Sequence, residues 1–149
     1  MASQSHEHPA ITFLKSLYKN CDQGFINLRF LPSAKNLFIP LNEINTIPSI
    51  LEAHQDQNAY FGAATRENGD GTKRGVIQIP ALWLDYDLDL QAEAQGEKEL
   101  FSIFFDFPLE PSFIVLSGGG IHAYWRLKEP MLREETPRAE DLLKRLASY

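Results

Sequence analysis

Cysteine is almost absent from this 149-residue chain, in which Cys21 stands alone. A single cysteine excludes an intramolecular disulfide and any zinc site that needs two or more thiolates. The first ten residues contain no apolar signal-peptide core. No stretch approaches the roughly 18 apolar residues that a membrane helix needs. The sequence therefore predicts a cytoplasmic protein that does not act in a membrane.

Positive charge is also scarce, because 14 Lys and Arg residues stand against 20 Asp and Glu, for a net charge of −6. Residues 1–75 carry seven charges of each sign, whereas residues 76–149 carry seven basic and thirteen acidic ones. A protein that binds nucleic acid by charge alone needs the opposite balance. If the chain binds polyanions, a divalent metal has to lie between its own carboxylates and the negative charges of the ligand. The hydrophobic fraction of 44% fits one globular domain.

Short elements follow one another along the chain, without internal repeats or long linkers. Helical spacing of apolar residues predicts helices, and alternation predicts strands. The predicted helices cover residues 9–19, 48–55, 92–107 and a last segment from about 134. The predicted strands cover residues 24–31, 35–41, 58–65, 79–90, 112–117 and 121–127. Residues 67–75 are expected to form a polar turn or a mobile loop.

Three aspartates lie in the strand ALWLDYDLDL, residues 81–90. The strand period of two puts Trp83, Asp85, Asp87 and Asp89 on one face, with same-face Cα atoms about 6.5–7 Å apart. Carboxylates in a row repel one another, and a bound cation would explain them. Oxygen ligands favour Mg²⁺ or Mn²⁺. Taken alone, the pattern is more often a solvated strand end beside a helix N-terminus.

A second polar face occurs in SGGGIHAYWRL, residues 117–127, where the same period aligns His122, Tyr124 and Arg126. The three glycines before His122 remove every Cβ atom from the approach to this face, so backbone amides or a ligand can come close. A hairpin turn and a structural histidine explain each feature separately. Together the two strands predict that Asp85, Asp87 and His122 share one face of one sheet.

The segments LWLDYDLD and FIVLSGGGIHAYWRL, separated by one predicted helix, resemble motifs I and II of the archaeo-eukaryotic primase (AEP) superfamily. The resemblance is to the bifunctional primase-polymerases of plasmids, phages and integrated elements. The segments AYFGAATRENGDGTKRG and FINLRFLP with FIPL are also similar to that group. The resemblance implies an α+β fold: a two-layer, RRM-like antiparallel or mixed sheet with helices on one face, joined to a small N-terminal α/β unit.

The function implied by the resemblance is template-directed nucleotidyl transfer, as a DNA primase or DNA polymerase, with Mg²⁺ or Mn²⁺ as cofactor. Its partners would be a single-stranded DNA template, NTP or dNTP, and a C-terminal helicase or accessory domain of the parent chain. The implied catalytic residues are Asp85 and Asp87, which would hold the metal, and His122, which would contact the phosphates. The other implied nucleotide-binding residues are Gly118, Gly119, Gly120, Arg66 and Arg126, with Lys73 and Arg74 as template contacts.

Two features depart from the pattern of that superfamily. Its members often have serine two residues before the motif II histidine, where this chain has Gly120. Their third carboxylate normally lies beyond the helix that follows motif II, and this sequence stops at Tyr149 without a helix stop signal. We therefore expect residues 1–149 to be the N-terminal part of a catalytic domain, truncated at its C-terminus and weakly active or inactive alone. Asp89 is the alternative third ligand.

Two other functions are compatible with the same residues. A glycosyltransferase of the DxD type would hold Mn²⁺ against a nucleotide-sugar diphosphate. A non-catalytic module would bind single-stranded nucleic acid or nucleotides by stacking bases on Trp83 and Tyr124. Both aromatic residues are equally well explained by packing in the core.

Overall fold

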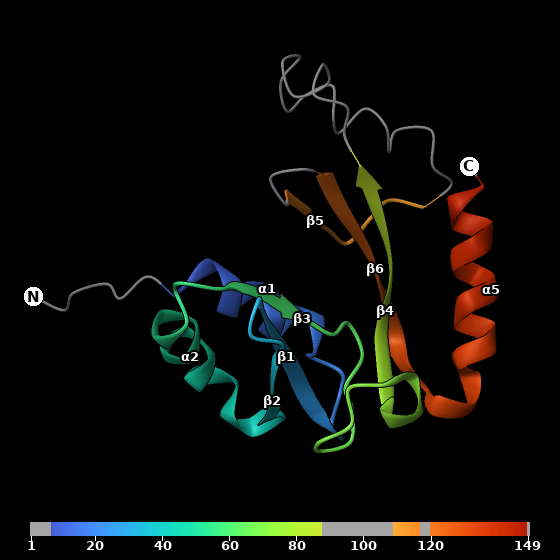
Figure 1. Cartoon of the computed structure of the whole chain (residues 1–149). Coiled ribbons are helices and arrows are strands. Elements are labelled where there is room, and N and C mark those ends of the chain that lie inside the picture. The colour runs from blue at the N-terminus through green and yellow to red at the C-terminus, as the bar shows by residue number, and fades with distance from the viewer. Residues whose placement is uncertain (1–6, 88–108, 117–119, 149) are drawn as a thin grey trace, which may run out of the picture. The chain divides into compact units, whose positions relative to one another are not determined.

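The computed structural model describes residues 7–87, 109–116 and 120–148 (Figure 1). The chain divides into two compact units, Met1–Pro80 with Lys128–Arg133, and Ala81–Leu127 with Glu134–Tyr149. None of the helices in the described part is long and apolar enough to span a membrane. The predicted helix at residues 92–107 lies outside the described residues. The predicted α+β class is confirmed, with two small three-stranded sheets.

The sheet of the first unit has the strand order β2-β1-β3, and all its pairs are antiparallel. The central strand β1 (Phe25–Leu31) pairs with β2 (Lys35–Pro40) and with β3 (Asn58–Phe61). Strand β3 is shorter than the predicted strand 58–65. After Gly62 the pairing with β1 is interrupted: the amide of Thr65 donates to the carbonyl of Gln78, and Arg66 then pairs with Phe25 of β1 as an isolated bridge. This interruption ends the strand.

Two α-helices accompany this sheet, α1 (Pro9–Leu17) and α2 (Ile47–Ala53), the second preceded by the 3₁₀ helix η1 (Leu41–Thr46). Both α-helices confirm the predictions, whereas η1 was missed because its apolar residues have no clear helical period. Each fully buried aliphatic or aromatic side chain stabilises the fold by about 1.5–3 kcal/mol. The core residues of these elements are Ile11, Leu14, Leu17, Ile26, Leu28, Phe30 and Ile47.

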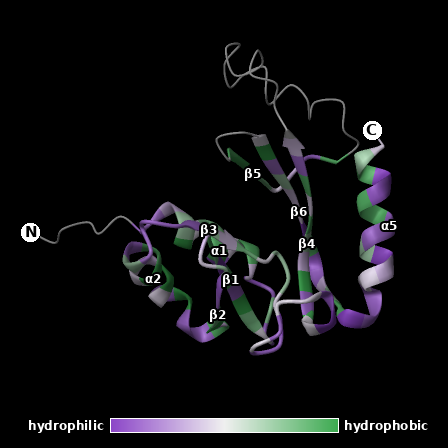
Figure 2. Cartoon of the chain, viewed as in Figure 1, coloured by the Kyte–Doolittle hydropathy of each residue, from purple (hydrophilic) through white to green (hydrophobic). Residues whose placement is uncertain are grey.

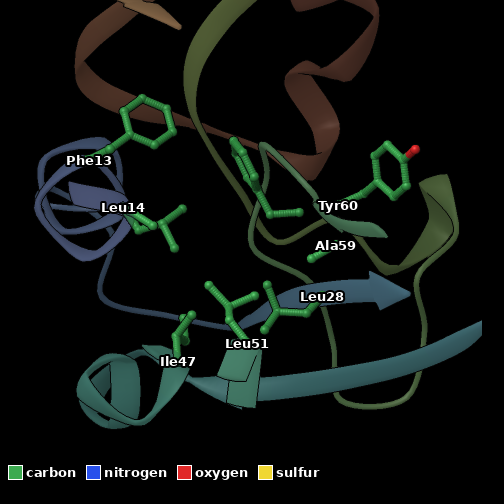
Figure 3. A pocket seen from close by; sticks show the side chains of 9 residues that line it. Phe13, Leu14, Leu28, Ile47, Leu51, Ala59 and Tyr60 are labelled. Atoms are coloured by element: carbon green, nitrogen blue, oxygen red, sulfur yellow. The ribbon is translucent and has the colours of Figure 1, made fainter. Parts of the chain in front are cut away.

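An apolar cavity of about 150 Å³ lies in the first unit, between α1, α2, β1 and β3 (Figure 3). Phe13 and Leu14 of α1 line one side, and Ile47 and Leu51 of α2 line another. The hydroxyl group of Tyr60 points away from the other labelled side chains, so polar groups are scarce at this cavity. Such a lining offers no ligand for a metal or a phosphate.

Residues 67–75 fold as hydrogen-bonded turns, the first of the two predicted alternatives. The Arg66 side chain donates from Nε to the Gly71 carbonyl at 3.1 Å. Asp70 Oδ1 accepts from the amide and hydroxyl of Thr72 at 2.9 and 2.6 Å, which lowers the pKa of Asp70. Arg133 closes the segment by donating to Glu67 Oε1 at 2.6 Å. Two arginines thus hold the segment, Arg133 at its start and Arg66 at its middle.

The sheet of the second unit has the order β4-β6-β5. Strand β5 (Phe113–Leu116) runs antiparallel to β6 (Gly120–Leu132), and β4 covers Gln78–Asp87. The helix α5 (Thr136–Ala147) follows a short 3₁₀ helix, η3 (Arg133–Glu135). Figure 2 shows hydrophobic and hydrophilic residues alternating along α5, as expected of an amphipathic helix. Strand β6 extends five residues beyond the predicted 121–127 and includes Pro130.

Candidate functional site

The structure brings Asp85 and His122 together across neighbouring strands β4 and β6. The Nε2 atom of His122 lies 3.2 Å from Oδ1 of Asp85. The side chain of His122 is 29% exposed and that of Asp85 is 49% exposed, so a ligand can reach both. The prediction that these two residues share one face of one sheet is confirmed. The period of two on each strand is the cause, since it fixes the face from which each side chain emerges.

Strands β4 and β6 run in opposite directions at this site. An added Cβ on Gly120 would lie against Tyr86, His122 contacts Asp85, and Tyr124 stacks on Trp83. Residue numbers thus rise on one strand as they fall on the other, which is the pattern of an antiparallel pair. The end of β4 that carries Asp85 therefore lies beside the start of β6.

An aromatic row, formed by Trp83, Tyr124 and Phe113, crosses the three strands next to this pair. The Trp83 and Tyr124 rings stack with centroids 6.3 Å apart and planes inclined by 25°. Phe113 is the direct partner of Tyr124 in the antiparallel register, so both side chains lie on one face. The pattern of a single strand does not single out Phe113. The antiparallel register of β5 and β6 identifies it.

Tyr124 is buried at 3% exposure, although its strand face was expected to be polar. Its neighbours in the aromatic row cover the ring, which a single-strand pattern does not reveal. Burial and the negative charge of Asp85 raise the pKa of Tyr124 to about 12. The phenol is therefore neutral at physiological pH, and it adds no second negative charge beside Asp85.

The opposite face of β6 is apolar and buried, as the alternation predicts. Ile121 and Ala123 are fully buried, and Trp125 is 6% exposed. The Trp125 indole Nε1 donates to the carbonyl of Leu109 at 3.1 Å, so the one polar atom of its side chain is satisfied. Packing of this apolar face fixes the position of β6, and with it the backbone that carries His122 on the opposite face.

Gly120 permits the close approach of β6 to the end of β4. A Cβ atom at this position would lie 2.4 Å from the carbonyl oxygen of Tyr86 and 3.5 Å from Oδ1 of Asp85. The first distance is shorter than any that a real side chain tolerates. A serine here would clash in the same way, so the glycine is consistent with this backbone geometry. Gly118 and Gly119 lie outside the described residues.

Replacing Gly120 by Ala is expected to lower the free energy of unfolding by about 1–3 kcal/mol, because the methyl group forces the two strands apart. Urea denaturation measures this change. Gly62→Ala is the matched control, since its Cβ would meet its nearest atom, Nη1 of Arg66, at 3.5 Å. Equal stability of the two variants would show that the strands adjust without cost.

Arg126 continues the same strand face, two positions beyond Tyr124. Its guanidinium carbon lies 5.7 Å from the centroid of the Phe113 ring, within range of a cation–π contact. Its backbone amide donates to Ser112 Oγ at 2.9 Å. The side chain is exposed, so its predicted contact with nucleotide is compatible with its surroundings.

Arg66 belongs to the first unit and is engaged by its own chain. Besides the bond to Gly71, its Nη1 donates to the carbonyl of Ala64 at 3.4 Å. Burial lowers the pKa of this guanidinium below its usual value. Its backbone bridges Phe25 and Val76. These contacts give Arg66 a structural role, and its predicted contact with phosphate or template stays a prediction, as do those of Lys73 and Arg74.

The donor set that the structure describes suits a weakly held hard cation. Asp85 offers an accessible carboxylate, and no group of three or more candidate ligands forms among the described residues. Magnesium is commonly bound through one or two carboxylates, with water and substrate phosphates completing its shell. The backbone of Asp87 lies in β4, but its side chain and the whole of Asp89 lie outside the described residues. Their predicted roles are therefore untested.

No protein-family model and no curated protein matches the sequence. Among solved structures, the AEP domain of the primase-polymerase (PrimPol) of Cyanophage S-2L is similar, with a TM-score of 0.58 and 21% identity. The match covers 93% of this chain and 70% of that chain. The chain therefore has the fold of an AEP domain, and the fold implied by its motifs is confirmed.

Proposed function

We propose that the chain catalyses metal-dependent nucleotidyl transfer on a single-stranded DNA template, as a DNA primase or DNA polymerase. The observation that carries the proposal is the Asp85–His122 pair, 3.2 Å apart on neighbouring strands of an AEP-type fold. Its two partly exposed side chains combine a ligand for a hard cation with a ring nitrogen for phosphate. The similar domain belongs to a phage primase-polymerase, and the proposal includes a role in replicating a phage, plasmid or integrated element.

The reaction requires little covalent participation from the protein. The 3′-oxygen of the growing strand forms a bond to the α-phosphorus of the nucleotide, and the bond to pyrophosphate breaks. Catalysis of such a transfer depends on positioning and on stabilising negative charge. Bound Mg²⁺ or Mn²⁺ would neutralise the charge on the attacking and leaving oxygens.

Each residue of the site has a role that follows from its chemistry. Asp85, with Asp87, would hold the cation through carboxylate oxygens. His122 would donate a hydrogen bond to a phosphate oxygen, and Arg126 would add positive charge on the same strand face. These roles would also explain the excess of acidic residues in the second half of the chain, because carboxylates attract the cations that bind triphosphate.

Nucleotide incorporation tests the proposal directly. The chain is incubated with single-stranded DNA, with or without a primer, and with labelled dNTP or NTP in Mg²⁺ or Mn²⁺. Because residues 1–149 are expected to be weakly active or inactive alone, we expect at most slow incorporation, which excess EDTA abolishes. Metal-dependent binding of dATP is expected even where no incorporation is detected. A chain that binds DNA equally well in EDTA and binds dATP without metal would contradict the proposal. That result would favour the second candidate, a non-catalytic binding module, which the exposed Trp83 supports.

A further inference from the structure

Among the described aromatic residues of the second unit, Trp83 is the one whose side chain is exposed. Its indole is 39% exposed, whereas the other tryptophan of the chain, Trp125, is 6% exposed. Large aromatic side chains dominate the energetics of cores and interfaces. An exposed indole next to the Asp85–His122 pair is therefore a candidate contact for a ligand. Asp85 follows two residues later on the same strand, which puts both side chains on one face.

The surroundings of Trp83 fix the orientation of its ring. One neighbour is the buried Tyr124, with the two planes inclined by only 25°. The other is His122, whose ring centroid lies 5.9 Å away at an inclination of 51°. An aromatic surface supported in this way loses little conformational freedom when a ligand stacks on it. The indole is therefore held in position beside the Asp85–His122 pair.

We propose that Trp83 is a stacking platform for a nucleobase of the substrate, adjacent to the Asp85–His122 pair. This inference rests on the proposed function, since it assumes that the pair binds the phosphates directly or through a cation. A nucleotide combines an anionic part, suited to a cation and His122, with a flat ring, suited to an indole. Stacking of bases on aromatic residues tolerates any sequence, as a template-directed enzyme requires.

Fluorescence provides a readout that does not depend on activity. In the Trp125→Phe background, Trp83 is the single tryptophan, because the chain has two. Addition of dATP with Mg²⁺ is expected to quench its emission. Inorganic tripolyphosphate with Mg²⁺ carries the same charged groups without a base, and it is expected to bind with no such quenching. Quenching of equal size by both ligands would overturn the inference.

Affinity measurements on Trp83→Ala separate the base from the phosphates. Loss of one stacked base is expected to weaken binding about 5- to 150-fold. We expect this loss for dATP with Mg²⁺, an unchanged affinity for tripolyphosphate, and an intermediate loss for Trp83→Phe. Tyr60→Leu is the matched control, since this aromatic residue of the first unit is 52% exposed, and it should change neither affinity.

The base can belong to the incoming nucleotide or to the DNA strand, and a second pair of ligands distinguishes these sources. A twelve-residue thymidine oligonucleotide is compared with an abasic oligonucleotide of equal length in EDTA. If Trp83→Ala weakens the binding of dATP but not of tripolyphosphate, the platform stacks on the base of the nucleotide. If Trp83→Ala weakens the binding of the thymidine oligonucleotide but not of the abasic one, the platform stacks on a base of the DNA strand. No base-dependent loss with either ligand would overturn the inference.

Asp85→Asn separates failure of this inference from failure of the proposed function. If Asp85→Asn weakens tripolyphosphate binding in Mg²⁺ while Trp83→Ala has no base-dependent effect, only the stacking platform is wrong. If Asp85→Asn leaves tripolyphosphate binding unchanged, the metal and phosphate site itself is wrong, and so is the proposed function.

Discussion

Asp85→Asn is expected to lower metal-dependent nucleotide incorporation at least about 1,000-fold. The substitution keeps the shape of the side chain and removes the charge that would hold the cation. A catalytic metal contributes several kcal/mol to transition-state stabilisation, and each 1.36 kcal/mol is about tenfold in rate. The free energy of unfolding should change by no more than about 0.5 kcal/mol, because the side chain is 49% exposed. Incorporation assays and urea denaturation measure both quantities.

Asp141→Asn is the matched control for this experiment. Asp141 is 58% exposed and pairs with Arg145 within the helix α5, so its substitution removes the same charge from the same unit. We expect near-normal incorporation from this variant. Incorporation by Asp85→Asn within tenfold of the unchanged chain, with stability intact, would contradict a metal-binding role for Asp85.

His122→Ala is expected to weaken binding of dATP with Mg²⁺ about 10- to 150-fold. The magnitude is that of a lost hydrogen bond to a charged group, about 1.5–3 kcal/mol. Affinity for a single-stranded oligonucleotide in EDTA should change much less, because His122 is assigned to the phosphates of the nucleotide. His122→Gln retains a donor and should recover part of the loss.

His8→Ala is the control for the loss of an imidazole, since His8 is an exposed residue that caps α1 in the first unit. It should leave nucleotide affinity unchanged. Equal losses of nucleotide and oligonucleotide affinity in His122→Ala would instead indicate that the sheet has collapsed. In that case the histidine would be a packing residue.

The central pair of the site could be predicted from the sequence because it depends on local geometry. Alternation along a strand is a property of the backbone, so the face of Asp85 and of His122 follows from the residue order alone. The adjacency of β4 and β6 came from a different source, the resemblance of the two motifs to a known superfamily. The alternation along each strand and the resemblance of the motifs were together sufficient to predict the contact between Asp85 and His122.

Features that depend on neighbouring strands could not be predicted in this way. Tyr124 lies on the polar face of its own strand, and the sequence left ligand contact and core packing equally open for it. It is buried because Trp83 and Phe113 flank it from two other strands. Gly120 was interpreted as leaving room for backbone amides or a ligand, and in the structure the backbone carbonyl of Tyr86 lies in that space. Strand β3 is shorter than predicted because Thr65 pairs with Gln78, 13 residues further along the chain.

Diffraction from crystals grown with Mn²⁺ and a non-hydrolysable nucleoside triphosphate tests the central claim most directly. Anomalous scattering locates the manganese independently of the protein coordinates. The account predicts a manganese ion within about 2.5 Å of a carboxylate oxygen of Asp85, with the triphosphate bridging it to His122. A nucleotide bound elsewhere, or manganese absent from Asp85 while the triphosphate is bound, would contradict the account.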